Sequence, residues 1–100
     1  MATDLYRYDF DEKVQSEDLE AALLLAIWSC EALHGEAQTR LDAAHFLDPA
    51  KRACVIDAGT PVGRDLNRLF VGFIGREIGA DAFTVKRVAQ HDHQQQEAAA

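Results

Sequence analysis

Cysteine is scarce in this sequence, and its spacing excludes the common metal and redox motifs. Cys30 and Cys54 are the two cysteines of the 100-residue chain, and they lack the close pairing that binds zinc or forms a redox site. Both lie in apolar runs, where a free cysteine behaves as a small hydrophobic residue. A disulfide between Cys30 and Cys54 is the alternative that the sequence leaves undecided. His91 and His93 fall in a polar tail. We expect no metal site of defined geometry and no cofactor.

Long apolar runs are also missing. The longest, at 21–30, is about half of the ~20 residues that a membrane-spanning helix needs. Residues 1–12 are acidic and alternate between polar and apolar side chains, which differs from a secretory signal peptide. We therefore expect a cytoplasmic protein that has no membrane partner.

Basic residues are few. The chain has 10 Lys and Arg against 17 Asp and Glu, for a net charge of −7. This balance argues against non-specific binding to nucleic acid, which needs clustered positive charge. The imbalance falls on residues 1–36, which hold nine acids and two bases. Such an acidic stretch is typical of a solvated surface, and its alternative role is to dock on a basic protein partner.

Apolar residues make up 48% of the chain, which suits one hydrophobic core and one ordinary globular domain. The periodicity predicts these elements in chain order: a strand at 4–11, a helix at 17–34, strands at 37–47 and 52–58, a helix at 61–79 and a strand at 82–88. The order β-α-β-β-α-β is that of a split βαβ, ferredoxin-like α+β sandwich, in which two helices pack on one face of a four-stranded antiparallel sheet. We expect residues 1–89 to form this domain and residues 90–100 to be a disordered polar tail.

Both predicted helices have start signals. Ser16 is a favourable N-cap for the first helix. Thr60 followed by Pro61 is a strong start for the second, because threonine caps well and proline suits the first helical position.

The first helix carries more apolar residues than one core can cover. Its predicted buried stripe, at i, i+3, i+4 spacing, consists of Leu19, Leu23, Ala26, Ile27, Cys30 and Leu33. A second set, Leu24, Leu25 and Trp28, points in other directions. A helix that is apolar on two sides is usually covered on two sides, and in so short a chain the sheet covers one. The second set therefore predicts a partly exposed face or a subunit interface.

Two glycines are placed unusually in the second helix. Gly72 and Gly75 lie inside it, and each glycine in a helix interior costs about 0.5–1 kcal/mol relative to alanine. Their i, i+3 spacing makes a smooth patch, and Val71 adds an apolar side chain off the buried stripe. We expect this patch to pack closely, either within the fold or against another chain.

The strand–turn–helix segment at 57–65 is the main candidate for ligand binding. A helix amino terminus offers free N–H groups and a favourable dipole to an anion, and Arg64 and Arg68 add positive charge nearby. The glycine-rich phosphate-binding motifs are absent from the segment. Turn geometry accounts for Gly59, and capping accounts for Thr60.

Asp42 and Asp57 extend this candidate site. They lie on adjacent predicted strands, nearly opposite each other if residue 47 pairs with residue 52. Two close carboxylates raise one pKa and can act as an acid/base pair or as metal ligands, whereas a register slip of one residue would separate them. The full candidate set for ligand binding is Asp42, Asp57, Gly59, Thr60, Arg64, Asp65 and Arg68.

The sequence favours a non-enzymatic protein-interaction or regulatory module that forms a homo-oligomer, most simply a dimer. No serine or cysteine has a histidine or acid that local sequence places beside it, so no catalytic residue is predicted. Either the helices pair across a two-fold axis or the sheets pack face to face. The alternative is a small-ligand-binding or catalytic domain that uses segment 57–65 with Asp42. The predicted interface residues are Leu24, Leu25, Trp28, Val71, Gly72 and Gly75.

Overall fold

The computed structural model describes residues 4–89. The elements are β1 (Asp4–Phe10), α1 (Ser16–His34), α2 (Glu36–Asp42), β2 (His45–Asp48), β3 (Ala53–Asp57), α3 (Pro61–Glu77), the short 3-10 helix η1 (Ala80–Ala82) and β4 (Phe83–Ala89). The tail at 90–100, which we predicted to be disordered, lies outside the described residues.

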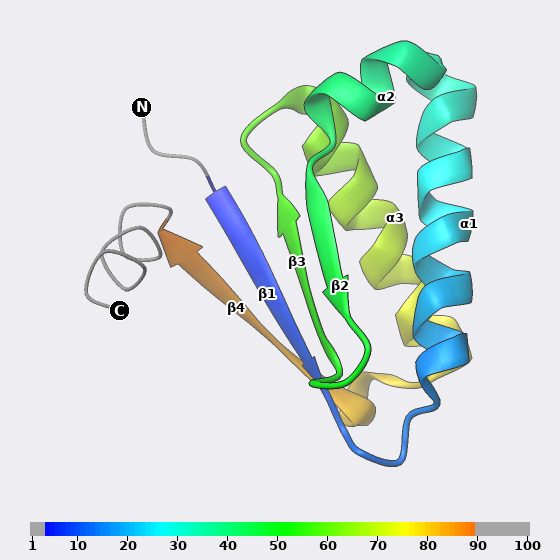
Figure 1. Ribbon diagram of the computed structural model, residues 1–100, viewed down its shortest axis with the longest axis vertical. Coiled ribbons are helices and arrows are strands. Elements are labelled where there is room, and N and C mark those ends of the chain that lie inside the picture. The colour runs from blue at the N-terminus through cyan, green and yellow to red at the C-terminus, as the bar shows by residue number, and fades with distance from the viewer. Residues whose placement is uncertain (1–3, 90–100) are drawn as a thin grey trace.

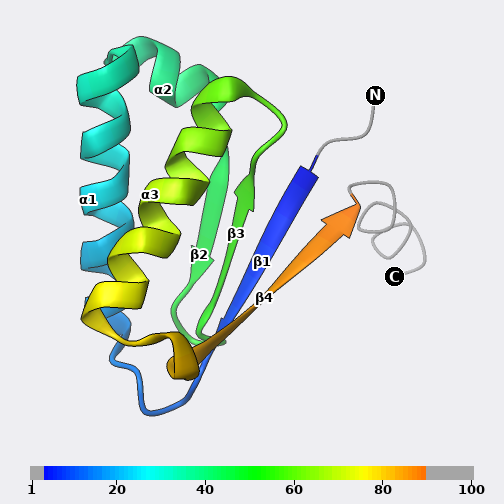
Figure 2. The same cartoon turned by 180° about the vertical axis from the view of Figure 1, so that it is seen from behind.

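The four strands form one sheet in the order β2-β3-β1-β4, and every neighbouring pair is antiparallel. Figures 1 and 2 show α1 and α3 side by side on the same face of this sheet. In the described part of the chain, the opposite face carries no helix. The α+β class and the split βαβ order of strands are therefore confirmed, with one helix more than predicted.

The additional helix, α2, corrects the predicted strand at 37–47. Residues 36–42 read E-A-Q-T-R-L-D, which are mostly good helix formers. Gly35 adopts a φ of 88°, which lets the chain break after α1 and begin a new helix. Arg40 and Glu36 form an i, i+4 ion pair at 3.2 Å. The strand β2 is short as a result, and Leu47 pairs with Cys54 rather than with residue 52.

Aromatic side chains from β1 fill the core beneath α3. Tyr8 and Phe10 are buried, as the alternation in the first strand predicted. The ring of Tyr8 packs edge-on against Phe70 with centroids 5.0 Å apart, and its hydroxyl donates a hydrogen bond to Oδ1 of Asn67. Burial, together with the neighbouring Cys54, raises the pKa of Tyr8 above its ordinary value.

The inner face of α1 consists largely of small residues. The buried residues of this helix are Leu19, Ala22, Leu23, Ala26 and Cys30. Leu33, which we placed in the buried stripe, is largely exposed because it lies in the last turn, beyond the last buried residue of α1. Gln15, not Ser16, occupies the N-cap position, and it makes no capping hydrogen bond through its side chain.

Candidate functional site

The segment between β3 and α3 is held by its own hydrogen bonds. Thr60 caps α3 as predicted, because its Oγ1 accepts a hydrogen bond from the N–H of Gly63 at 2.9 Å. The same hydroxyl donates to the carbonyl of Asp42. A Cβ on Gly63 would lie 2.1 Å from the carbonyl oxygen of Asp57, so glycine is required there. At the predicted anion site, the Thr60 hydroxyl and the N–H of Gly63 are therefore already engaged in hydrogen bonds within the fold.

The carboxylates of Asp42 and Asp57 do not form the predicted strand pair. Asp42 ends α2 and is not part of the sheet, because residues 36–42 are helical. Its carboxylate accepts a hydrogen bond from the side-chain amide of Gln38. Asp57 accepts one from the N–H of Gly59 at 2.8 Å, which closes the turn before α3. Each carboxylate is thus engaged locally.

Asp65 connects the two long helices. Its Oδ2 lies 2.7 Å from Nε2 of His34 at the end of α1, and its Oδ1 lies 3.9 Å from a guanidinium nitrogen of Arg68. Arg68 and Arg64 both line a cavity of about 130 Å³ beside the start of α3, together with Asp4, Tyr6, Ala58 and Asn67. Of the predicted ligand-binding residues, the structure brings these two arginines to a shared cavity.

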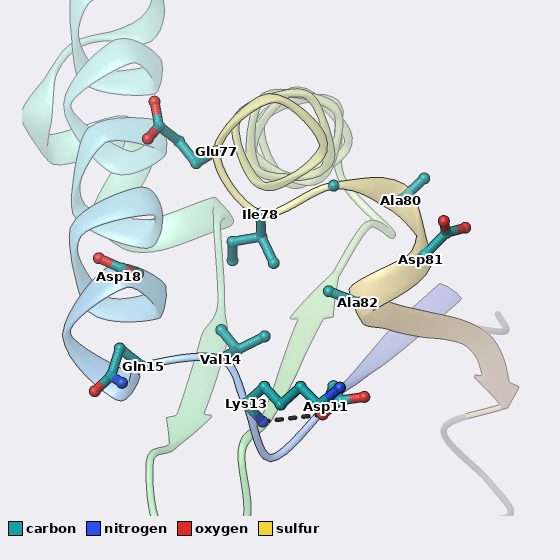
Figure 3. Close-up of a pocket in the computed structure, with 11 residues that line it drawn as sticks. Asp11, Lys13, Val14, Gln15, Asp18, Glu77, Ile78, Ala80, Asp81 and Ala82 are labelled. Atoms are coloured by element: carbon teal, nitrogen blue, oxygen red, sulfur yellow. Dashed lines mark hydrogen bonds between the residues drawn. The ribbon is translucent and has the colours of Figure 1, made fainter.

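A larger cavity of about 500 Å³ lies at the opposite end of the helices, where α3 ends and the β1–α1 loop passes η1 (Figure 3). Sequence reasoning did not identify it, because its walls come from two segments, 11–18 and 77–82, that are far apart in the chain. Four carboxylates line it, and Figure 3 shows that they do not converge on one point. Across residues 4–89, no three His, Cys, Asp or Glu side chains gather in a way that could hold a metal ion.

The two thiols are buried in the core as free cysteines. Burial raises the pKa of Cys54 to about 12. Burial, and to a lesser degree the charge of Asp65, also raises the pKa of Cys30. A reactive cysteine needs an accessible thiolate, so neither thiol is suited to act as a nucleophile near neutral pH.

The second apolar set of α1 lies on the molecular surface. Leu24, Leu25 and Trp28 are 44%, 46% and 58% exposed. Ala21 and Ala32 are exposed on the same side of the helix, which follows from their spacing of three, four and seven residues to the others. We refer to these five residues as the outer face of α1.

The corresponding surface of α3 is flat and basic. Five of the exposed residues of α3 share this side of the helix through spacings of three, four and seven residues. We refer to them as the outer face of α3: Arg64, Arg68, Val71, Gly72 and Gly75. Among residues 4–89, a Cβ on Gly72 or Gly75 would meet nothing within 4 Å. Close packing of these glycines within the fold is therefore wrong, and packing against another chain stays a prediction.

The sequence did not identify two further exposed apolar residues. Leu41 projects from α2, and Phe46 lies on the face of the sheet that the helices leave open, beside Val55. The available signal was Asp48, a polar residue that shares the parity of Phe46 on β2 and so marks the same side as solvent-facing.

The surfaces of this chain are its main source of functional information. No protein-family model matches the sequence, and a search of curated proteins finds no match. No helix within residues 4–89 has the length and apolar character needed to cross a membrane. The function is therefore inferred from the two cavities and from the outer faces of α1 and α3.

Proposed function

We propose that this protein is a cytoplasmic, non-enzymatic interaction or regulatory module that forms a homodimer. The observation that carries the proposal is the outer face of α1, where three large apolar side chains are exposed together. Burying one such side chain contributes about 1.5–3 kcal/mol. Clustered apolar exposure of this kind usually marks an interaction site.

Folding of one chain does not require this surface. The inner face of α1 already packs on the sheet and on α3, and three of its five buried residues are Ala22, Ala26 and Cys30. A surface helix needs one apolar stripe. Leu24, Leu25 and Trp28 point away from the core, so their burial requires a partner.

The test is the mass of the full chain over a range of concentrations. Sedimentation velocity and light scattering should give twice the 11.1 kDa of one chain at high micromolar concentration and a smaller mass on dilution. Trp28 is the one tryptophan, so its emission should shift to longer wavelength as the dimer dissociates. A monomer at high micromolar concentration would overturn the proposal.

A pair of variants provides the control. Leu25→Glu places a charge on the outer face of α1 and should give a folded monomer. Gln15→Glu adds the same charge at an exposed position before α1, and it should leave the dimer intact. Far-UV circular dichroism establishes that both variants are folded.

A basic protein bound through the acids of residues 1–36 is the heteromeric form of the same proposal. Glu17, Asp18 and Glu20 are exposed in the first turns of α1. Such a partner would co-purify from the native host at low salt and dissociate at high salt, because exposed charges are screened. A basic partner bound to a chain that stays monomeric would support this form over the homodimer.

The cavity beside Arg64 and Arg68 favours a second candidate, a small-ligand-binding or catalytic domain for an anionic compound. Tyr6 and Asn67 supply further polar groups to this cavity. A thermal-shift assay with inorganic phosphate and with nucleotides tests it. Stabilisation of the wild type that is lost in Arg64→Gln would support the candidate, and no response to any of these anions would overturn it.

A further inference from the structure

We propose that the outer face of α1 in one copy packs against the outer face of α3 in a second copy, about a two-fold axis parallel to the helices. The inference rests on the proposed homodimer and goes further by naming the two surfaces that meet. A two-fold axis forms this contact twice, because each copy supplies one face of each kind.

Charge complementarity favours this pairing over contact between two α1 helices. The charged residues of α1 are Glu17, Asp18, Glu20, Glu31 and His34, and His34 is turned toward Asp65. Two α1 helices in contact would therefore bring acids against acids. The exposed bases of α3 are Arg64, Arg68 and Arg76. Glu77, in the last turn, is the remaining exposed acid of α3. Opposite charges at the edge of an interface favour the correct register.

The shapes of the two faces are also complementary. The outer face of α1 is bulky because of Leu24, Leu25 and Trp28, whereas Gly72 and Gly75 leave the surface of α3 flat and unoccupied. Side chains of one helix pack into the grooves of another, and missing Cβ atoms allow closer approach. The helix-propensity cost of the two glycines then has a structural reason.

The antiparallel arrangement of the helices sets which residues meet. In Figure 1, α1 ends and α3 begins at the same end of the sheet, where His34 contacts Asp65. A two-fold axis parallel to the helices keeps each end at the same level in both copies. Glu31 near the end of α1 therefore faces Arg68 of the second copy, and Trp28 can stack on the same guanidinium.

The open face of the sheet is less suited to self-association. Phe46, Val55, Arg7 and Lys86 are consecutive neighbours across its four strands. Face-to-face packing would bury Lys86 and Arg7, which pairs with Asp9 at 3.2 Å, in the middle of the contact. Removing charges from water is costly even where they are paired.

On the outer face of α3, Arg64 and Arg68 lie toward the start of the helix, and Val71, Gly72 and Gly75 follow them. The charges of this face are therefore at one end of the contact, whereas an apolar core with a polar rim is typical of stable interfaces.

Charge reversal tests the pairing, with the dimer dissociation constant measured by sedimentation at low salt. Glu31→Arg and Arg68→Glu should each weaken the dimer about tenfold, because both symmetric contacts change from attraction to repulsion. The double variant carries the swapped pair and should recover most of the wild-type affinity. Lys86→Glu on the open sheet face is the control, and it should leave the dissociation constant unchanged.

The outcomes separate this inference from the proposed dimer. If the wild type dimerises but Arg68→Glu has no effect, or if the double variant is weaker than both single variants, the pairing of α1 with α3 is wrong and the dimer stands. If Lys86→Glu alone disrupts the dimer, the sheet is the interface. If the wild type stays monomeric, the proposed function fails and the pairing fails with it.

Discussion

The helices α1 and α3 lie side by side on one face of the sheet, but they distribute side-chain size in opposite ways. α3 buries its bulky residues, among them Leu66, Phe70 and Ile74, and exposes arginines and glycines. α1 buries several small residues and exposes Leu25 and Trp28. The fold of one chain explains almost all of α3. It explains only the buried side of α1, and the exposed apolar side is the surface that we propose to be an interface.

The largest expected effect is the difference between a buried aromatic residue of α3 and the exposed one of α1. Phe70→Ala removes a fully buried ring that packs on Tyr8 and Phe10, and it should lower the free energy of unfolding by about 3–5 kcal/mol. Trp28→Ala, measured by urea unfolding of the dilute monomer, should change it by less than about 0.5 kcal/mol. An equal loss of unfolding free energy in both variants would mean that the fold of one chain depends on the outer face of α1.

The next effect concerns pH and the thiol on β3, the strand that α3 contacts. Burial raises the pKa of Cys54 from 9.0 to about 12. Above pH 9 the unfolded chain releases a proton that the folded chain keeps, so this contribution to stability is complete below pH 9 and is lost as the pH rises toward 12. The slope is about 1.4 kcal/mol per pH unit.

Comparison with Cys54→Ala isolates this slope, because the other titrating groups are the same in both proteins. The stability of the wild type should fall more steeply than that of the variant between pH 9 and pH 11, by chemical unfolding at each pH. Cys30→Ala reports the corresponding contribution of α1, whose thiol pKa is also raised by burial. Parallel curves for the wild type and Cys54→Ala would contradict the expectation.

The starts of the two helices should differ by a smaller amount. Thr60 caps α3 through its side chain, so Thr60→Ala should cost about 1 kcal/mol. Ser16 is the first residue of α1, and its hydroxyl contacts Glu17 rather than a backbone N–H. Ser16→Ala should therefore change stability by less than about 0.5 kcal/mol in the same thermal unfolding assay. A larger loss in Ser16→Ala than in Thr60→Ala would show that α1 is capped in solution.

Local signals made most of the fold predictable from the sequence. The alternation of Tyr6, Tyr8 and Phe10 identified β1, and the Thr60–Pro61 pair fixed the start of α3. The helix α2 was missed because its residues also alternate in polarity, and a seven-residue helix shows too few turns for the two periods to be told apart.

The candidate site was less predictable, because it depends on tertiary contacts. The prediction that Asp42 and Asp57 pair across two strands was wrong because α2 was taken for a strand. Asp42 lies in α2 and so cannot pair with a residue of the sheet. The need for glycine at position 63 follows from the approach of the Asp57 carbonyl, which no local pattern encodes. The exposed set on α1 was found because surplus hydrophobicity is a property of one helix alone.

The two exposed glycines of α3, Gly72 and Gly75, give the smallest effect and the most decisive one. The stability of the fold and the affinity of the proposed dimer should change with opposite signs. A Cβ at position 72 or 75 meets nothing within 4 Å, so Gly72→Ala and Gly75→Ala should each stabilise the dilute monomer by about 0.5–1 kcal/mol. Gly79→Ala is the matched control. It has equal space, but its φ of 97° strains any side chain, so this variant should be destabilised.

The same two variants should weaken the proposed dimer, because each added methyl group would occupy the surface on which we propose that the outer face of α1 packs. Thermal unfolding of dilute protein measures the first effect, and sedimentation at high concentration measures the second. A gain in monomer stability with an unchanged dissociation constant would show that the glycines serve neither fold nor contact. The difference between α1 and α3 would then lie in α1 alone.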